Sequence, residues 1–134
     1  MVRLSKRVEY ALIALRHIAS QADGGTVTAR EISLRCGIPH DLTAKVLQRL
    51  ARSNLVVSHQ GSRGGYRMRL RPEQVPVSLV ISSIEGETPS LTRCMTDGPG
   101  GCEVFGLCTI REPLGRVQAG LERAFGTMTL AEIL

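Results

Sequence analysis

Aromatic residues are scarce in this chain: its 134 residues include two Phe, two Tyr and no Trp. A core must therefore be built from aliphatic side chains, which the 43% hydrophobic content can supply. No apolar run approaches the roughly 18 to 20 residues of a membrane-spanning helix, and no signal peptide precedes the domain. We therefore expect one compact soluble domain with an appended arm, located in the cytoplasm.

The sequence also lacks the residue sets on which catalysis depends. Paired carboxylates, a Ser/His/Asp set and a phosphate-cradling glycine loop are all missing, since the glycines of 61–65 lie between expected strands rather than between a strand and a helix. We therefore predict a binding protein and not an enzyme.

Acidic residues are few in the first half of the chain. Residues 1–75 carry 13 Lys and Arg against 5 Asp and Glu, a net charge of +8, whereas residues 76–134 carry 4 against 7, a net charge of −3. A field of this sign attracts nucleic acid and makes binding salt-dependent. A solvated basic face that only keeps the protein soluble is the alternative.

Three helices are predicted in the basic half. Ser5 is an N-cap for a helix through about Ala22, and a capping box at 28–31 predicts a short helix over 29–36 that ends at Gly37. A third helix runs from about His40 to Ser53, with Leu42, Val46, Leu47 and Leu50 inward and His40, Thr43, Ala44, Lys45, Gln48 and Arg49 outside. This arrangement is a helix-turn-helix, which can lay its second helix in a major groove.

Two alternating segments, 55–59 and 66–70, follow this unit after Asn54, which can adopt the left-handed conformation. They predict a hairpin with a basic tip, a wing whose Arg63 could reach backbone phosphate or the minor groove. An ordinary surface hairpin is the alternative. The candidate DNA contacts are His40, Thr43, Lys45, Gln48, Arg49, Gln60, Ser62 and Arg63.

Three cysteines, Cys94, Cys102 and Cys108, form a Cys-x7-Cys-x5-Cys pattern around a Gly/Pro-rich turn where little favours helix or strand. A disulfide is disfavoured by the odd number of thiols and by the reducing cytosol. Structural zinc sites show closer Cys pairs, although three thiolates and another ligand remain possible. An iron–sulfur cluster tolerates this wide spacing and leaves one site for a non-cysteine ligand.

The remaining segments predict how the chain is organised. A short helix is expected over 77–85, and a long one carries the apolar stripe Ile110, Leu114, Val117, Leu121 and Phe125, with Pro113 in its first turn. Such a stripe must pack, and the same helix of a second chain is the simplest partner, so we expect a homodimer. A capping box at 129–132 predicts a last short helix. We divide the chain into a DNA-binding domain at 1–75, a linking helix and cysteine loop at 76–109, and a dimerisation helix with the last helix at 110–134.

Four motifs in this order resemble the iron–sulfur winged-helix transcription regulators, the family that includes IscR, NsrR and RirA. They are Arg3-Leu4-Ser5-Lys6 with Tyr10-Ala11, the wing Gly61 to Tyr66, the cysteine loop, and the terminal Met128 to Leu134. The resemblance implies a homodimer that binds a pseudo-palindromic double-stranded operator. It implies a repressor whose operator affinity is controlled by a cluster that senses nitric oxide, iron or iron–sulfur status, or redox state.

The resemblance also bears on the fourth ligand. IscR-like proteins place a His where this chain has Arg111, NsrR-like proteins use a carboxylate where it has Glu9, and two-iron redox sensors add a His where it has Ile13. Three Cys with Glu9 from a partner subunit fit a [4Fe–4S] cluster best, with [2Fe–2S] as the other form. His17 is expected to be solvated, His59 to be a wing-strand residue near DNA backbone, and Cys36 a small buried residue. The alternative is a thiol-redox or zinc-bound winged-helix regulator, or an accessory protein without an operator.

Overall fold

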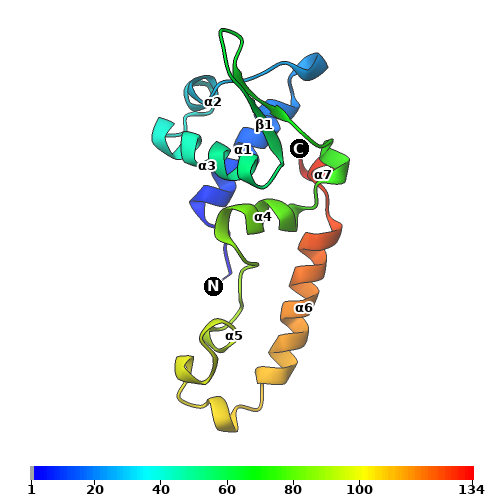
Figure 1. Cartoon of the computed structure of the whole chain (residues 1–134). Coiled ribbons are helices and arrows are strands. Elements are labelled where there is room, and N and C mark those ends of the chain that lie inside the picture. The colour runs from blue at the N-terminus through cyan, green and yellow to red at the C-terminus, as the bar shows by residue number, and fades with distance from the viewer. Residues whose placement is uncertain (1) are drawn as a thin grey trace.

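A computed structural model describes residues 2–134, and it confirms a mainly helical chain with one small antiparallel hairpin (Figure 1). Among these residues no helix is both long and apolar enough to cross a membrane. Four 3-10 turns lie between the main helices and strands, at Ala22–Gly24, Pro72–Gln74, Gly98–Gly101 and Phe105–Leu107. The main elements are α1 (Lys6–Ala19), α2 (Ala29–Cys36), α3 (His40–Arg52), β1 (Val56–His59), β2 (Gly65–Met68), α4 (Val77–Glu85), α5 (Arg93–Asp97), α6 (Arg111–Thr127) and α7 (Leu130–Ile133).

Local sequence signals set most helix ends, as predicted. The Ser5 hydroxyl accepts from the Val8 N–H at 3.3 Å, and the Thr28 hydroxyl accepts from the Glu31 N–H at 3.1 Å, which caps α1 and α2. Gly37 ends α2 and Asn54 follows α3, both with positive φ.

The expected extension of α1 to Ala22 is wrong, because the helix ends at Ala19. Ser20 and Gln21 instead donate their side chains to the carbonyl of His17, at 2.6 and 3.3 Å. These bonds satisfy a carbonyl that would otherwise lack a partner at the helix end.

One aliphatic core holds the basic half together, as the scarcity of aromatic residues predicts. Residues of α1, α2 and α3 pack around fully buried Leu15, Leu47 and Leu50. The same core includes Val80, Ile81 and Ile84 of α4 and Leu130 of α7. Two backbone bonds, Val77 N–H to Met128 O at 2.8 Å and Leu130 N–H to Val75 O at 2.9 Å, fasten the end of the chain beside the start of α4.

The hairpin pairs Val56 with Met68 and His59 with Gly65. Val27 forms an isolated antiparallel bridge to the hairpin, because its N–H and C=O both bond to Tyr66, at 2.9 and 2.7 Å. Gly65 lies at this crossing with φ 139°, and a Cβ there would be 2.7 Å from the Val27 oxygen. Only glycine therefore allows the wing to pack this closely on the segment before α2.

The cysteine segment and α6 form an arm that projects from the globular part, with the loop between them at the far end from the hairpin tip (Figure 1). The expectation of a loop without helix is wrong, since α5 and two 3-10 turns occupy 93–107. The apolar stripe of α6 is covered only in part in the single chain. Val117 is 57% exposed and Ile110, just before the helix, is 58% exposed, whereas Leu114, Leu121 and Phe125 are half-buried.

Candidate functional site

The outer face of α3 and the tip of the wing present the polar side chains expected to contact DNA. His40, Lys45, Gln48 and Arg49 are exposed on α3, and Gln60, Ser62 and Arg63 are exposed at the tip. The tip is held in shape because the Thr26 hydroxyl donates to the Arg63 carbonyl at 2.9 Å and the Gly64 N–H donates to the Gly61 carbonyl at 2.9 Å. A preformed basic helix face and loop can contact a phosphate backbone together.

Thr43 is not on that face, and the prediction that it lies outside is wrong. It is 1% exposed, and its hydroxyl donates to the Pro39 carbonyl one turn earlier at 3.0 Å. The bond to its own helix satisfies the hydroxyl, so Thr43 can be buried on the same side as Val46, Leu47 and Leu50. The spacing i, i+3, i+4, i+7 from Thr43 was the signal that could have placed it inward.

Cys94 lies in α5, and Cys102 and Cys108 directly follow the two 3-10 turns of the arm. All three are half-buried free thiols, and the Cys94 sulfur is 3.1 Å from the Thr92 hydroxyl. As a donor set, three free thiols suit a soft metal centre. Among residues 2–134, however, no three Cys, His, Asp or Glu side chains are gathered closely enough to hold a metal ion. Within one chain the thiols are therefore suitable donors but not yet a closed ligand set.

Arg111, which stands where IscR-like relatives would place a His, has a structural role in this chain. Its guanidinium donates to the Phe105 carbonyl at 3.1 Å and lies 4.0 Å from the centre of the Phe105 ring. The bond and the cation–π contact close the loop between Cys102 and Cys108 against the start of α6.

Gln118 of α6 was not singled out from the sequence, yet it holds the segment that leads into the cysteines. Its amide accepts from the Leu91 N–H and donates to the Pro89 carbonyl, both at 3.0 Å. One side chain thus fixes two backbone groups of the segment 86–92 to the long helix. A polar residue on a mainly polar helix gave no sequence signal for this contact.

Glu9 lies in the first turn of α1, where it is half-buried and bonded to Lys6. The distance from Lys6 Nζ to Glu9 Oε2 is 2.7 Å, and hydrogen bonding to this carboxylate raises the pKa of Lys6. Ile13, one turn further along, is 40% exposed. The carboxylate is therefore accessible on the surface of α1, and in the single chain its partner is the Lys6 ammonium.

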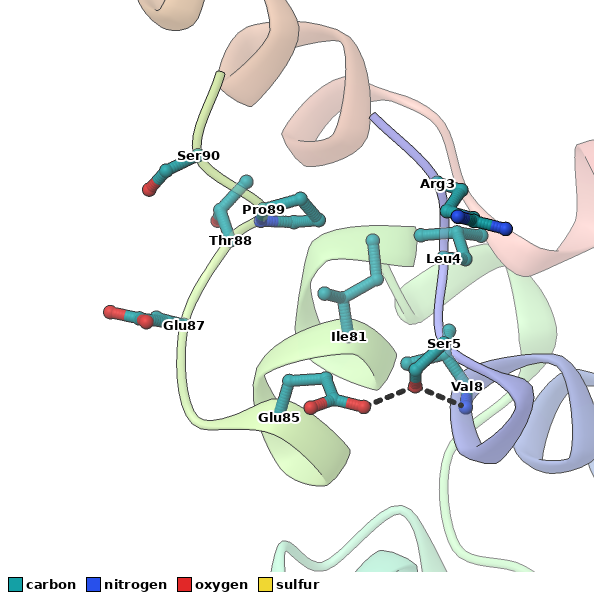
Figure 2. Close-up of a pocket in the computed structure, with 10 residues that line it drawn as sticks. All are labelled: Arg3, Leu4, Ser5, Val8, Ile81, Glu85, Glu87, Thr88, Pro89 and Ser90. Atoms are coloured by element: carbon teal, nitrogen blue, oxygen red, sulfur yellow. Dashed lines mark hydrogen bonds between the residues drawn. The ribbon is translucent and has the colours of Figure 1, made fainter. Parts of the chain in front are cut away.

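The end of α4 connects the arm to α1 and α3. Arg49 of α3 donates to the Ile84 carbonyl at 2.8 Å, and the Ser5 hydroxyl, while capping α1, donates to the Glu85 carboxylate. Figure 2 shows the Ser5–Glu85 contact at a cavity of about 210 Å³ between the N-terminal segment, α4 and the segment 87–90. Neither contact was predicted, because the partners are 35 and 80 residues apart in the chain.

The two remaining histidines are less accessible than expected, whereas Cys36 packs much as expected. His17 is not solvated: it is half-buried, its Nε2 is buried without a hydrogen-bond partner among the described residues, and it lies 3.8 Å from Glu31 Oε1. His59 Nε2 is likewise buried and unpaired among these residues. Cys36 is half-buried and packs against the core, as expected of a small apolar side chain.

A helix-turn-helix followed directly by a wing, with basic side chains exposed on both, defines a winged-helix DNA-binding protein. Residues 4–134 match the family Rrf2, described as "Iron-dependent Transcriptional regulator". The chain belongs to the Rrf2 family and is a transcription regulator that is similar to the proteins named IscR. Its relatives are named as transcriptional regulators, which confirms the prediction that it is not an enzyme.

Two curated relatives are named HTH-type transcriptional regulator IscR. That of Aliivibrio salmonicida is 33% identical over 102 residues, which covers 76% of this chain but only 59% of the relative's own length. That of Cronobacter sakazakii is 30% identical over 133 residues, 99% of this chain and 80% of the relative.

A solved structure of CymR, the global cysteine regulator of B. subtilis, has the same fold. Its TM-score is 0.76 at 20% identity, with 99% of this chain and 96% of that chain covered. At this identity the likeness shows the fold alone, and it supports the winged-helix arrangement with a projecting arm.

Proposed function

We propose that the protein is a cytoplasmic homodimeric repressor whose affinity for a pseudo-palindromic operator is controlled by an iron–sulfur cluster. Cys94, Cys102 and Cys108 would hold the cluster, with Glu9 of the partner subunit as the fourth ligand. The observation that carries the proposal is the set of three free thiols on an arm that is tied to the DNA-reading helices. When bound, the cluster would supply a redox-active centre with one labile iron that small molecules can reach.

Two contacts provide a route from the arm to the reading head. The segment 86–92 begins where α4 ends, and that end is held by Arg49 and Ser5. A shift of the segment therefore acts on α3, through Arg49, and on the first turn of α1, through Ser5. Because α1, α3 and α4 share one close-packed core, such a shift would be felt as a change in the position of the reading helix.

The proposed dimer follows from the exposed part of the apolar stripe of α6. Val117 is 57% exposed in the single chain and lies on the same face as Leu114 and Leu121. Pairing this face with its copy would bury the stripe and place two reading heads at a fixed spacing. A two-fold dimer reads two half-sites, which is why a pseudo-palindromic operator is proposed.

A thiol-redox or zinc-bound regulator without a cluster is the second candidate function. It is favoured by the free state of Cys94, Cys102 and Cys108, which are half-buried thiols without a disulfide. Thiols that are half-buried, free and placed on a loop with several glycines could instead react with an oxidant or close around a single zinc ion.

Anaerobic purification followed by iron, zinc and acid-labile sulfide analysis separates these functions. We expect about four iron and four sulfide per chain for a [4Fe–4S] form, and about two of each for [2Fe–2S]. Operator affinity should then change when the cluster is removed by nitric oxide or oxygen. Zinc without sulfide, or reversible thiol oxidation in a metal-free protein, would overturn cluster control in favour of the second function.

Glu9→Ala is expected to give a more labile or spectrally altered cluster with weakened or deregulated DNA binding. A carboxylate holds iron less tightly than a thiolate does, so its loss changes one iron and leaves the three thiolate-bound irons in place. Visible absorption, the rate of cluster loss in air and cluster-dependent operator affinity measure the effect.

Lys6→Gln is the matched control, because it removes the 2.7 Å ion pair but keeps the Glu9 carboxylate. An exposed ion pair contributes at most about 1 kcal/mol, so this variant should keep the wild-type spectrum. An unaltered spectrum and lability in Glu9→Ala would instead place the fourth ligand elsewhere.

A further inference from the structure

We infer that the outer face of the wing carries a second DNA contact, a row of arginines that binds the phosphate backbone of DNA flanking the operator. The arginine row consists of Arg67, Arg69 and Arg71, which follow the wing tip in sequence. The inference rests on the DNA-binding role of the protein but concerns side chains beyond the helix face and tip already described.

Strict alternation places the three arginines on one face. Tyr66, Met68 and Leu70 pack against the core, whereas Arg67, Arg69 and Arg71 are all exposed. The Arg69 N–H donates to the Leu55 carbonyl at 3.0 Å, one residue past the end of β2, and the chain then bends at 69 and 70. The three arginines therefore lie on the exposed side of one short segment of the chain.

The row also lines a hollow of about 230 Å³. The other walls of the hollow come from the end of α1, at Ile18 and Ala19, and from the backbone of Gly24 and Gly25. Arg67, Arg69 and Arg71 all border this one hollow. Like charges within one Debye length, roughly 8 to 10 Å, repel one another until an anion is bound. A concave cationic surface of this kind therefore favours a polyanion as its ligand.

The position of the row indicates which polyanion this is. The row continues along the same chain segment from Arg63 at the tip, which is itself expected to touch DNA. In Figure 1, α2 and α3 lie on one side of the hairpin, and the turn at Ala22–Gly24 lies on the other. Because Gly24 borders the hollow, the row faces away from the reading helices, and DNA that reaches it must extend beyond the half-site that α3 reads.

Binding to duplexes of two lengths tests the inference. The full-length protein first selects its operator from a random DNA library. The selected operator is trimmed to the shortest duplex that still binds. The extended duplex adds about 10 bp, one helical turn, to each end of this trimmed duplex. Wild type should bind the extended duplex more tightly and with a steeper salt dependence. Arg67→Gln/Arg69→Gln should lose that gain, with the slope reduced by up to about 1.8 because each phosphate contact contributes about 0.9. Its affinity for the trimmed duplex should be unchanged.

The matched control is Arg116→Gln/Arg123→Gln, which removes the same charge from two exposed arginines of α6. It should keep the gain from flanking DNA. The proposed role of the arginine row is overturned if Arg67→Gln/Arg69→Gln keeps the full gain in affinity for the extended duplex, or if that variant has a changed oligomeric state. It is also overturned if inorganic phosphate at matched ionic strength competes with DNA, which would indicate a small-anion site. If wild type selects no duplex at all, the operator function itself fails, and this result is distinct from the other three.

Discussion

Cys94→Ala, Cys102→Ala and Cys108→Ala should each abolish the visible absorption of the anaerobically purified protein and its acid-labile sulfide. Removing one thiolate leaves an iron without its soft protein ligand, and the loop that carries the thiols has little other packing to retain a cluster. Leu107, between Cys102 and Cys108, is 91% exposed, so it contributes no packing that could hold a cluster in place of a thiolate. Operator binding by the three variants should no longer respond to nitric oxide or oxygen.

Cys36→Ala is the internal control for these variants. Cys36 is also a free, half-buried thiol, but it ends α2 and packs on the core. It should keep the wild-type content of iron and sulfide. If only two of the three loop cysteines mattered, a disulfide switch would explain the result better, because a disulfide joins two thiols. Wild-type iron and sulfide in all three loop variants would refute the ligand assignment.

Lys45→Ala/Arg63→Ala should weaken operator binding and reduce the steepness of its salt dependence. Lys45 is exposed on α3 and Arg63 is exposed at the wing tip, so the pair removes one contact from each DNA-facing surface. With about 0.9 lost from the log–log salt slope per phosphate contact, the double variant should lose about 1.8. Unlike the loss predicted for the arginine row, this loss should be equal on trimmed and extended duplexes.

Gln48 allows base preference to be tested separately from the loss of positive charge. An exposed Gln on the reading helix can bond to an adenine edge, so Gln48→Ala should relax the preference at one base pair by about 1–3 kcal/mol while leaving the salt slope unchanged. Arg116→Gln/Arg123→Gln again controls for net charge. Unchanged affinity and salt slope in Lys45→Ala/Arg63→Ala would remove the proposed DNA interface.

Arg49 was predicted to contact DNA, and in the structure its side chain bonds to the backbone of α4. It is exposed on α3, yet its guanidinium donates to the Ile84 carbonyl at the end of α4. A carbonyl at a helix C-terminus carries partial negative charge, which favours a cationic partner. Arg49 therefore links the reading helix to the arm, and a DNA contact from the same side chain remains a prediction.

The sequence by itself determined the features that depend on neighbours along the chain. The caps at Ser5 and Thr28 are side chains that bond to a backbone N–H three residues further along. Gly37 and Gly86 end α2 and α4 in the left-handed conformation, which Asn54 also adopts after α3. The four motifs on which the family resemblance rests also lie in local segments, and the match of residues 4–134 to the Rrf2 family confirms that resemblance.

Only the tertiary structure decided which distant groups meet. It buried Thr43, joined Ser5 to Glu85 and Arg49 to Ile84, and used Gln118 to hold the segment before the cysteines. These contacts depend on how helices pack in three dimensions, and sequence periodicity gives the face of a helix but not its partner. The same limit applies to Cys94, Cys102 and Cys108, whose spacing predicts a shared metal centre although the fold of a single chain leaves them apart.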